Sequence, residues 1–206
     1  MHDADRFIDG GHFLTQFADR VLVRCSRCDA VGLVIATSEI NPRQGVFRCA
    51  ACGLNLARAK GDWVGPVVIK GYRACGQCGY RISSARSLPS CPASLPKTAK
   101  VTCAQCRQPQ EIDVAVLPDW PPDRCIDPHL GLPLLLSAAT RHGVIWAYNE
   151  RHLAELKGYV AARLRIRRGT GNGTMFSRYP AWIKAAKNRD LVLKALGRLE
   201  AKLTAA

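Results

Sequence analysis

Aromatic residues are scarce in this sequence, since tryptophan, tyrosine and phenylalanine together make up 7% of its 206 residues. With so few large side chains, the first half of the chain does not suggest one large hydrophobic core. Small modules of that kind usually depend on bound metals or disulfides for their stability.

Long apolar runs are also missing. The longest apolar patch, Leu132–Leu136, contains Pro133 and is far shorter than the roughly 18 residues of a membrane-spanning helix. The first residues, Met1–Arg6, include acidic side chains and no apolar run, which does not fit a secretory signal. We therefore expect a cytoplasmic protein with no membrane partner. In that reducing compartment, cysteines serve as metal ligands more readily than as disulfides.

The motifs of several enzyme classes are absent. The sequence contains no Gly-x-x-x-x-Gly-Lys-[Ser/Thr] phosphate loop, no His-Glu-x-x-His, no Gly-x-Ser-x-Gly, and no His-x-Glu ahead of a Pro-Cys-x-x-Cys. The five histidines are scattered. His142 and His152 flank a predicted strand and could approach each other, but ordinary surface or helix positions are the simpler expectation. We expect no enzymatic activity and no small-molecule substrate.

Acidic residues are few beside basic ones: 16 Asp and Glu stand against 30 Lys and Arg, a net charge of +14. The excess is concentrated in Ile126–Ala206, which carries 14 basic and 5 acidic residues. Some cations at the end of a helix only complement its dipole. The total nevertheless favours a polyanionic partner, DNA or RNA. The expected contacts are eight basic residues of the C-terminal part, Arg163, Arg165, Arg167, Arg168, Arg178, Lys184, Lys187 and Arg189.

Cysteine, by contrast, is abundant, and eight of the ten cysteines form four Cys-x-x-Cys pairs. On a tight turn, a two-residue gap lets both sulfurs face one ion, and two such turns complete a tetrahedral four-thiolate zinc site. Gly53 and Gly79 follow two of the pairs and help the main chain to turn, whereas Asp29 and Arg107 follow the other two. We predict two Zn²⁺ ions, with the ligands Cys25, Cys28, Cys49, Cys52, Cys75, Cys78, Cys103 and Cys106.

The pairing of these turns has two solutions. Sequential pairing closes shorter loops and is slightly favoured by loop entropy. In the cross-braced alternative, the first and third pairs share one ion. Cys91 and Cys125 are left over and are expected to be small buried side chains, because neither has a histidine partner nearby in the sequence.

The region from Val21 to Val116 resembles the zinc-ribbon modules of transcription factors, RNA polymerase subunits and replication proteins. The likeness rests on the cysteine spacing and implies structural zinc. Cys75–Tyr80, Cys-Gly-Gln-Cys-Gly-Tyr, also resembles one metal-binding turn of rubredoxin, in which four sulfurs hold a redox iron. Rubredoxins are acidic whereas this chain is basic, so zinc is the favoured metal and an iron electron carrier is the alternative.

The predicted fold class is α+β, with two small β-rich zinc ribbons followed by a small basic α+β domain. Short Val-rich runs at 21–23, 33–35, 67–69 and 112–116 are typical of strands. The Pro-rich stretch around residues 118–123 can be neither helical nor regularly paired, which marks a boundary. The expected segments are an N-terminal segment 1–20, the first ribbon 21–62, the second ribbon 63–117, a linker 118–128 and the C-terminal domain 129–206.

In the C-terminal domain, residues 144–148 are predicted to form a strand and Asn149 to cap a helix over 150–167. Pro180 fits the first turn of a short helix through 181–184, and a last helix is expected over 191–203. The segments 146–149 and 185–189, Trp-Ala-Tyr-Asn and Ala-Ala-Lys-Asn-Arg, resemble a poorly characterised bacterial family over residues 127–199. That likeness implies tandem ribbons ahead of a basic tail and no particular activity.

These observations favour a zinc-binding protein that binds nucleic acid or belongs to a nucleic-acid-processing assembly. Four aromatic residues, Trp146, Tyr148, Tyr179 and Trp182, could stack on bases, but a core role is the simpler expectation. The alternative is an adaptor that docks on a protein partner through its ribbons. The sequence also predicts that Cys49→Ser unfolds the first ribbon and spares the C-terminal helices.

Overall fold

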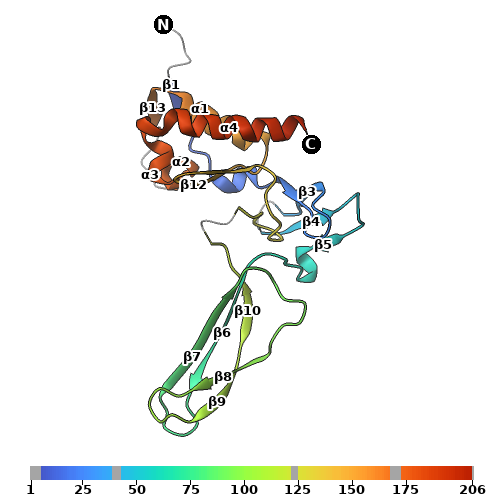
Figure 1. Ribbon diagram of the computed structural model, residues 1–206, viewed down its shortest axis with the longest axis vertical. Coiled ribbons are helices and arrows are strands. Elements are labelled where there is room, and N and C mark those ends of the chain that lie inside the picture. The colour runs from blue at the N-terminus through green and yellow to red at the C-terminus, as the bar shows by residue number, and fades with distance from the viewer. Residues whose placement is uncertain (1–5, 39–42, 122–124, 168–172, 206) are drawn as a thin grey trace. The chain divides into compact units, whose positions relative to one another are not determined.

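The computed structural model describes residues 6–38, 43–121, 125–167 and 173–205. The chain divides into two compact units: unit 1 is Met1–Asp62 with Asp123–Ala206, and unit 2 is Trp63–Pro122. The first cysteine-rich segment thus shares a unit with the C-terminal part, and the second forms a unit of its own. Short strands dominate and the long helices lie toward the C-terminus, which is consistent with the predicted α+β class (Figure 1).

The first sheet of unit 1 is antiparallel, in the order β2-β3-β4-β5. Its strands are β2 (Arg20–Arg24), β3 (Val31–Ala36), β4 (Gly45–Arg48) and β5 (Asn55–Ala57). Alternate residues of these strands face the core, and Val21, Val23, Val34 and Phe47 are almost completely buried. The strands expected at 21–23 and 33–35 therefore fall within β2 and β3.

A hairpin and two long helices form the C-terminal part of unit 1. The hairpin pairs β11 (Ser137–Thr140) with β12 (Gly143–Trp146), and the helices are α1 (Glu150–Ala161) and α4 (Arg189–Thr204). Helix α4 packs on the hairpin and on α1, with Val192, Ala195, Leu196 and Leu199 buried. The last helix predicted from the sequence is thus present. Among the described residues, no helix combines the length and the apolar character needed to cross a bilayer.

Five shorter helical segments complete the helices of unit 1 within the described residues. They are η2 (Leu14–Phe17), η3 (Arg58–Lys60), α2 (Met175–Arg178), α3 (Ala181–Lys184) and η4 (Ala186–Asn188). Pro180 is the N-cap of α3, next to the first-turn position that the sequence suggested. Asn149 caps α1 as predicted, because its side chain accepts the His152 N–H at 3.0 Å.

The prediction that α1 continues to Arg167 was wrong. The helix ends at Ala161, and β13 (Leu164–Arg167) pairs in parallel with β1 (Arg6–Asp9). Apolar and basic residues alternate along β13 with a period of two, which suits a strand. The Arg165 guanidinium turns back and donates to the Tyr159 carbonyl at 2.9 Å, so it satisfies the open end of α1.

Strand β2 is joined to the C-terminal part by main-chain hydrogen bonds. The Leu22 N–H donates to the Tyr148 carbonyl at 2.8 Å, and the Leu22 carbonyl accepts the Leu135 N–H at 3.0 Å. Farther along, the Arg24 N–H donates to the Pro133 carbonyl at 2.8 Å. The Asn149 side chain adds a bond to the Arg20 carbonyl at 2.8 Å. The first sheet and the C-terminal helices therefore share one core.

A buried carboxylate organises the loop that precedes β11. Asp127 is fully buried and accepts three main-chain N–H groups, from His129 at 2.8 Å, Leu130 at 2.9 Å and Leu132 at 2.5 Å. These bonds offset part of the cost of burying a charge, and burial still raises the pKa of Asp127. Asp127 falls in the segment that was expected to be a linker, but it belongs to the core of unit 1.

Unit 2 contains two small sheets. One has the order β10-β6-β7, and the other pairs β8 with β9. The strands are β6 (Val67–Ala74), β7 (Arg81–Leu88), β8 (Thr98–Thr102), β9 (Pro109–Asp113) and β10 (Ala115–Pro118). The run at 112–116, predicted as one strand, is divided at Val114 between β9 and β10.

The core of unit 2 is very small. The cluster around site 2 has the buried side chains Cys75, Ile82, Cys103 and Ile112, and Trp63 and Val67 are buried near the start of the unit. Two of the four residues around site 2 are thiols, so this part of the unit has little apolar area with which to offset its conformational entropy. The structure of unit 2 fits the sequence-based expectation of a module that depends on a bound metal.

The C-terminal aromatic residues pack around a buried histidine. His152 is fully buried, its Nδ1 accepts the Tyr148 N–H at 3.1 Å, and its Nε2 lies 2.7 Å from the Tyr179 hydroxyl. Burial lowers the pKa of His152 to about 3, so the ring is neutral. Trp146 stands edge-on to the same ring, at 5.7 Å. These contacts give a role in packing to three of the four aromatic residues that were considered for base stacking, namely Trp146, Tyr148 and Tyr179.

Candidate metal centres

Each Cys-x-x-Cys pair lies on the turn that connects two strands. The four turns follow β2, β4, β6 and β8, and they share one hydrogen-bond pattern. In each turn, the N–H of the first cysteine donates to the carbonyl of the residue five positions later. The N–H of the residue four positions later donates to the carbonyl of that cysteine. The carbonyls that accept from the first cysteines belong to Ala30, Leu54, Tyr80 and Gln108, at 2.8 to 2.9 Å.

The residue after each second cysteine adopts the left-handed conformation in all four turns. Its φ is 71° at Gly53 and 75° at Gly79, and it is 59° at Asp29 and 62° at Arg107. The two turns without glycine thus have the same geometry, at the cost of some backbone strain. At Asp29 the carboxylate is held by the Arg24 guanidinium at 2.9 Å, which supports the turn.

The turns bring the eight paired cysteines into two groups of four. Site 1 is Cys25, Cys28, Cys49 and Cys52, and site 2 is Cys75, Cys78, Cys103 and Cys106. Within each site the four sulfurs lie within 4.8 Å of one another. The structure thus combines the pairs sequentially, as loop entropy favoured, and not in the cross-braced order.

The sulfur spacing matches a tetrahedral metal site. In site 1, Cys25 and Cys52 approach to 3.6 Å, as do Cys28 and Cys49. In site 2 the corresponding distances are 3.6 and 3.7 Å. A tetrahedron with metal–sulfur bonds of about 2.3 Å has edges of about 3.8 Å, whereas a disulfide places its sulfurs about 2.05 Å apart. Each site can therefore hold one metal ion by four thiolates.

The electrostatics of the thiols also favour a cation. The Cys52 N–H lowers the pKa of Cys49 to about 6, and the Cys78 N–H does the same for Cys75. At Cys28, the Ala30 N–H acts in the same direction, but the neighbouring sulfurs and burial together raise the pKa to about 12. Four crowded thiols cannot all ionise by themselves, so a divalent cation is needed to stabilise four thiolates.

The two cysteines that belong to no Cys-x-x-Cys motif lie outside both sites. Cys91 is half-buried in the loop after β7, and burial raises the pKa of its thiol. Cys125 is also half-buried, and its carbonyl accepts the Leu134 N–H at 2.9 Å. Both are less buried than the sequence suggested.

Three of the eight basic residues predicted to contact nucleic acid donate to main-chain carbonyls. Arg165 bonds to Tyr159 and, at 2.7 Å, to Lys184, while its guanidinium stacks on the Tyr159 ring. Lys184 donates to Ser177 at 3.3 Å, and Arg189 to Ala162 at 3.2 Å. These three side chains have structural roles.

The side chains of four of the other five basic residues are exposed: Arg163, Arg167, Arg178 and Lys187. Arg168 lies outside the described residues. The Arg165–Lys184 and Arg189–Ala162 hydrogen bonds hold the segment 162–167 beside 184–189, so Arg163, Arg167 and Lys187 are carried on adjacent segments.

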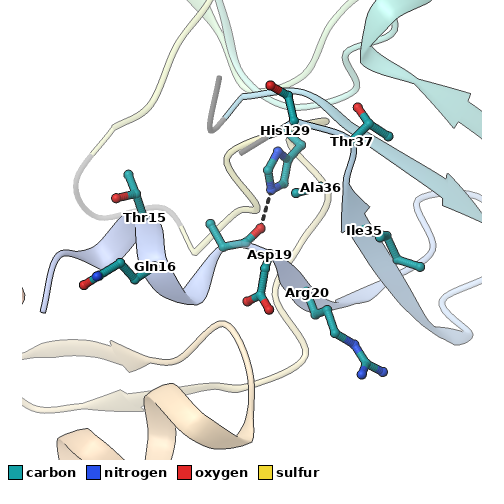
Figure 2. A pocket seen from close by; sticks show the side chains of 10 residues that line it. Thr15, Gln16, Asp19, Arg20, Ile35, Ala36, Thr37 and His129 are labelled. Atoms are coloured by element: carbon teal, nitrogen blue, oxygen red, sulfur yellow. Dashed lines mark hydrogen bonds between the residues drawn. The ribbon is translucent and has the colours of Figure 1, made fainter. Parts of the chain in front are cut away.

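An open hollow of about 790 Å³ lies beside η2 and the end of β3 (Figure 2). His129 lines it, and its Nε2 lies 2.7 Å from the Ala18 carbonyl. Two of the polar side chains around it bond to other groups: Asp19 pairs with Arg151 at 2.7 Å, and Gln16 accepts the Phe13 N–H at 2.8 Å.

One exposed aromatic residue escaped the sequence analysis. Tyr72 on β6 has 71% of its surface exposed, and the Arg81 guanidinium lies 5.0 Å from its ring centroid. The sequence did contain a signal for this position. Lys70, Tyr72 and Ala74 occupy alternate positions of β6, so their side chains lie on the same side of the strand. The metal ligands, by contrast, were all visible from their spacing.

Comparison of the chain with protein-family models gives no match, and comparisons with curated proteins and with solved structures give none either. The resemblance of residues 127–199 to a bacterial family therefore has no support from these comparisons. The likeness to tandem zinc ribbons rests on the two groups of four cysteines.

Proposed function

We propose that this chain is a cytoplasmic zinc protein whose two structural metal sites support binding to nucleic acid. The sulfur geometry of sites 1 and 2 supports the metal part. Four thiolates suit zinc or iron, and a site filled by four protein ligands has no open position for substrate. Zinc is preferred because this chain is strongly basic, unlike the rubredoxins that bind iron in this way. A coloured protein with visible absorption would indicate iron instead.

The nucleic-acid part of the proposal is supported by exposed positive charge. Arg163, Arg167 and Lys187 stand on adjacent exposed segments, and Arg178 ends the neighbouring helix α2. Phosphate contacts from such residues supply affinity without sequence readout. The observation that carries this part is the excess of basic residues over acidic ones in residues 126–206.

Replacement of these four residues by glutamine is expected to weaken binding and to flatten its salt dependence. Each phosphate contact contributes about 0.7 to 0.9 to the slope of log K against log salt concentration, so loss of four contacts should lower the magnitude of the slope by up to about 3.6. Fluorescence anisotropy with labelled DNA and RNA over a salt series measures both quantities.

A matched control changes four exposed lysines and arginines elsewhere in the described residues to glutamine: Lys60, Lys97, Arg141 and Lys194. It removes the same net charge and should leave most of the slope intact. An equal loss in the two variants would show that binding is diffuse and would contradict the assignment. A wild-type protein whose affinity does not respond to salt would remove the nucleic-acid proposal.

The adaptor alternative also has a structural observation in its favour. Val31, Ile35 and Val46 on the outer side of the first sheet are 39 to 49% exposed, and Ile35 is paired with Val46. Exposed apolar residues that are grouped in this way can mark a protein-binding surface. A stable partner that is captured after nuclease treatment, and that is lost in Ile35→Asp, would favour the adaptor.

A further inference from the structure

One face of the β10-β6-β7 sheet in unit 2 is exposed along most of β6 and β7. Tyr72 is paired with Ser83, Lys70 with Ala85, and Ala74 with Arg81. Paired residues of antiparallel strands lie on the same side of the sheet, so these side chains share one face. We call it the Tyr72 face; its residues on β6 and β7 are the half-buried Val68 and the exposed Lys70, Tyr72, Ala74, Arg81, Ser83, Ala85 and Ser87.

The opposite side of this sheet packs against the core of unit 2. Ile82 is buried there together with the cysteines of site 2, and Gly71 lies so close to β9 that a Cβ would clash with the Asp113 carbonyl. The core of unit 2 thus makes no use of Tyr72. Its 71% exposure is the largest among the exposed large apolar and aromatic side chains of the described residues, so a role in packing does not account for it.

The surroundings of Tyr72 suit a flat ligand. The Arg81 guanidinium lies 5.0 Å from the ring centroid and stabilises the ring by a cation–π interaction. Most of the ring surface remains open, and the other neighbours on the face are serine, alanine and one lysine. Because these side chains are small or flexible, a planar group can approach the ring without a steric obstacle.

The charge of the face is positive. Lys70 and Arg81 lie on it, and it carries no carboxylate. The acidic residues of unit 2 lie elsewhere: Glu111 and Asp113 belong to β9, and Asp119 follows β10. An aromatic ring flanked by two cations is the combination with which proteins bind unpaired bases and their phosphates.

We propose that the Tyr72 face is a binding platform for single-stranded nucleic acid. A base stacks on the open side of Tyr72, and Lys70 and Arg81 contact the adjacent phosphates. This inference rests on the proposed nucleic-acid function and adds the class of ligand and a site in unit 2, apart from the basic residues of unit 1. A peptide partner fits less well, because Tyr72 is the one aromatic side chain on the face, and its larger apolar residues, Val68 and Leu117 of β10, are paired with each other four residues away along β6.

The test compares Tyr72→Ala, Tyr72→Phe and Tyr80→Ala in the full chain. The probes are labelled oligo-dT and oligo-U of about 12 nucleotides and a DNA duplex of the same length. Tyr72→Ala should weaken single-strand binding about 10-fold or more, because it removes the stacking surface. Tyr72→Phe keeps the ring and should bind as the wild type does. Tyr80 is half-exposed but lies outside the face, so Tyr80→Ala should also bind normally.

The outcomes separate this inference from the proposed function. If the wild type binds single strands and Tyr72→Ala binds them equally well, the platform is wrong while nucleic-acid binding stands. If the wild type binds neither single strands nor duplex, the proposed function fails and the platform with it. Equal losses for single strand and duplex would also overturn the platform, since stacking needs an unpaired base. Zinc content equal to that of the wild type shows that each variant is folded.

Discussion

Replacing Cys103 by serine is expected to unfold unit 2 and to leave unit 1 folded, with zinc falling from two ions to one per chain. Cys103 is a fully buried residue of site 2, and two of the four residues in the buried cluster around this site are themselves metal-site cysteines. Metal binding to sites of this type contributes on the order of 10 kcal/mol, comparable to the whole stability of a small domain. The apolar contacts of unit 2 are too few to replace it.

Hydrogen–deuterium exchange with mass spectrometry measures the effect for each segment. In Cys103→Ser, peptides covering β6 to β10 should lose protection, whereas those covering α1 and α4 should keep it. Cys91→Ser is the matched control, because Cys91 is a half-buried cysteine of the same unit outside the metal site. Preserved protection of β6 and β7 in Cys103→Ser would contradict a metal-dependent unit 2.

The corresponding change in site 1, Cys49→Ser, should have a wider effect. The sequence alone predicted that the C-terminal helices would be spared. In the structure, however, β2 exchanges hydrogen bonds with Leu135 and Tyr148, and Val21 and Val23 are buried in the shared core. Loss of site 1 should therefore lower the protection of α1 and α4 as well. Unchanged protection of both helices would show that the ribbon and the helices are energetically independent.

Asp127→Ala is expected to destabilise unit 1 by about 3 kcal/mol or more. The substitution leaves three buried main-chain N–H groups, those of His129, Leu130 and Leu132, without their acceptor. Each unsatisfied buried donor costs about 1 to 3 kcal/mol, and relief from burying the charge offsets part of the total. Denaturant unfolding of the zinc-loaded protein, followed by the circular dichroism of the helices, measures the change.

Two further variants test the cause of that loss. Asp127→Asn keeps one carbonyl acceptor but places an NH₂ group among the three donors, so its effect should be intermediate. Asp190→Ala removes an exposed carboxylate from the first turn of α4 and should cost less than about 1 kcal/mol. If Asp127→Ala were no more harmful than Asp190→Ala, the loop would not depend on its buried carboxylate.

The metal sites could be predicted from the sequence because their information is local. A Cys-x-x-Cys turn is specified within a few residues, and sequential pairing needs only short loops. Even the turns at Asp29 and Arg107, which lack glycine, adopt the same left-handed conformation, because the hydrogen bonds of the turn impose it. The helix cap at Asn149 and the amphipathic pattern of α4 were equally local signals.

The features of the fold that the sequence did not predict depend on contacts between distant parts of the chain. The Asn149 side chain bonds to the Phe17 carbonyl, 132 residues away, and no local pattern announces that pairing. Strand β13 was mistaken for the end of α1 because its partner, β1, lies near the other end of the chain. The position of Asp127 beside a proline-rich stretch suggested a linker, and its burial became visible only with its three N–H donors in place.

The central claim is that this chain holds two tetrathiolate zinc sites. The most direct measurement is metal analysis of the purified full-length protein, combined with X-ray absorption spectroscopy at the zinc edge. The account predicts two zinc ions per chain, each surrounded by four sulfurs at about 2.3 Å. Fewer than two metal ions per chain, nitrogen or oxygen ligands in place of sulfur, or iron in place of zinc would contradict it.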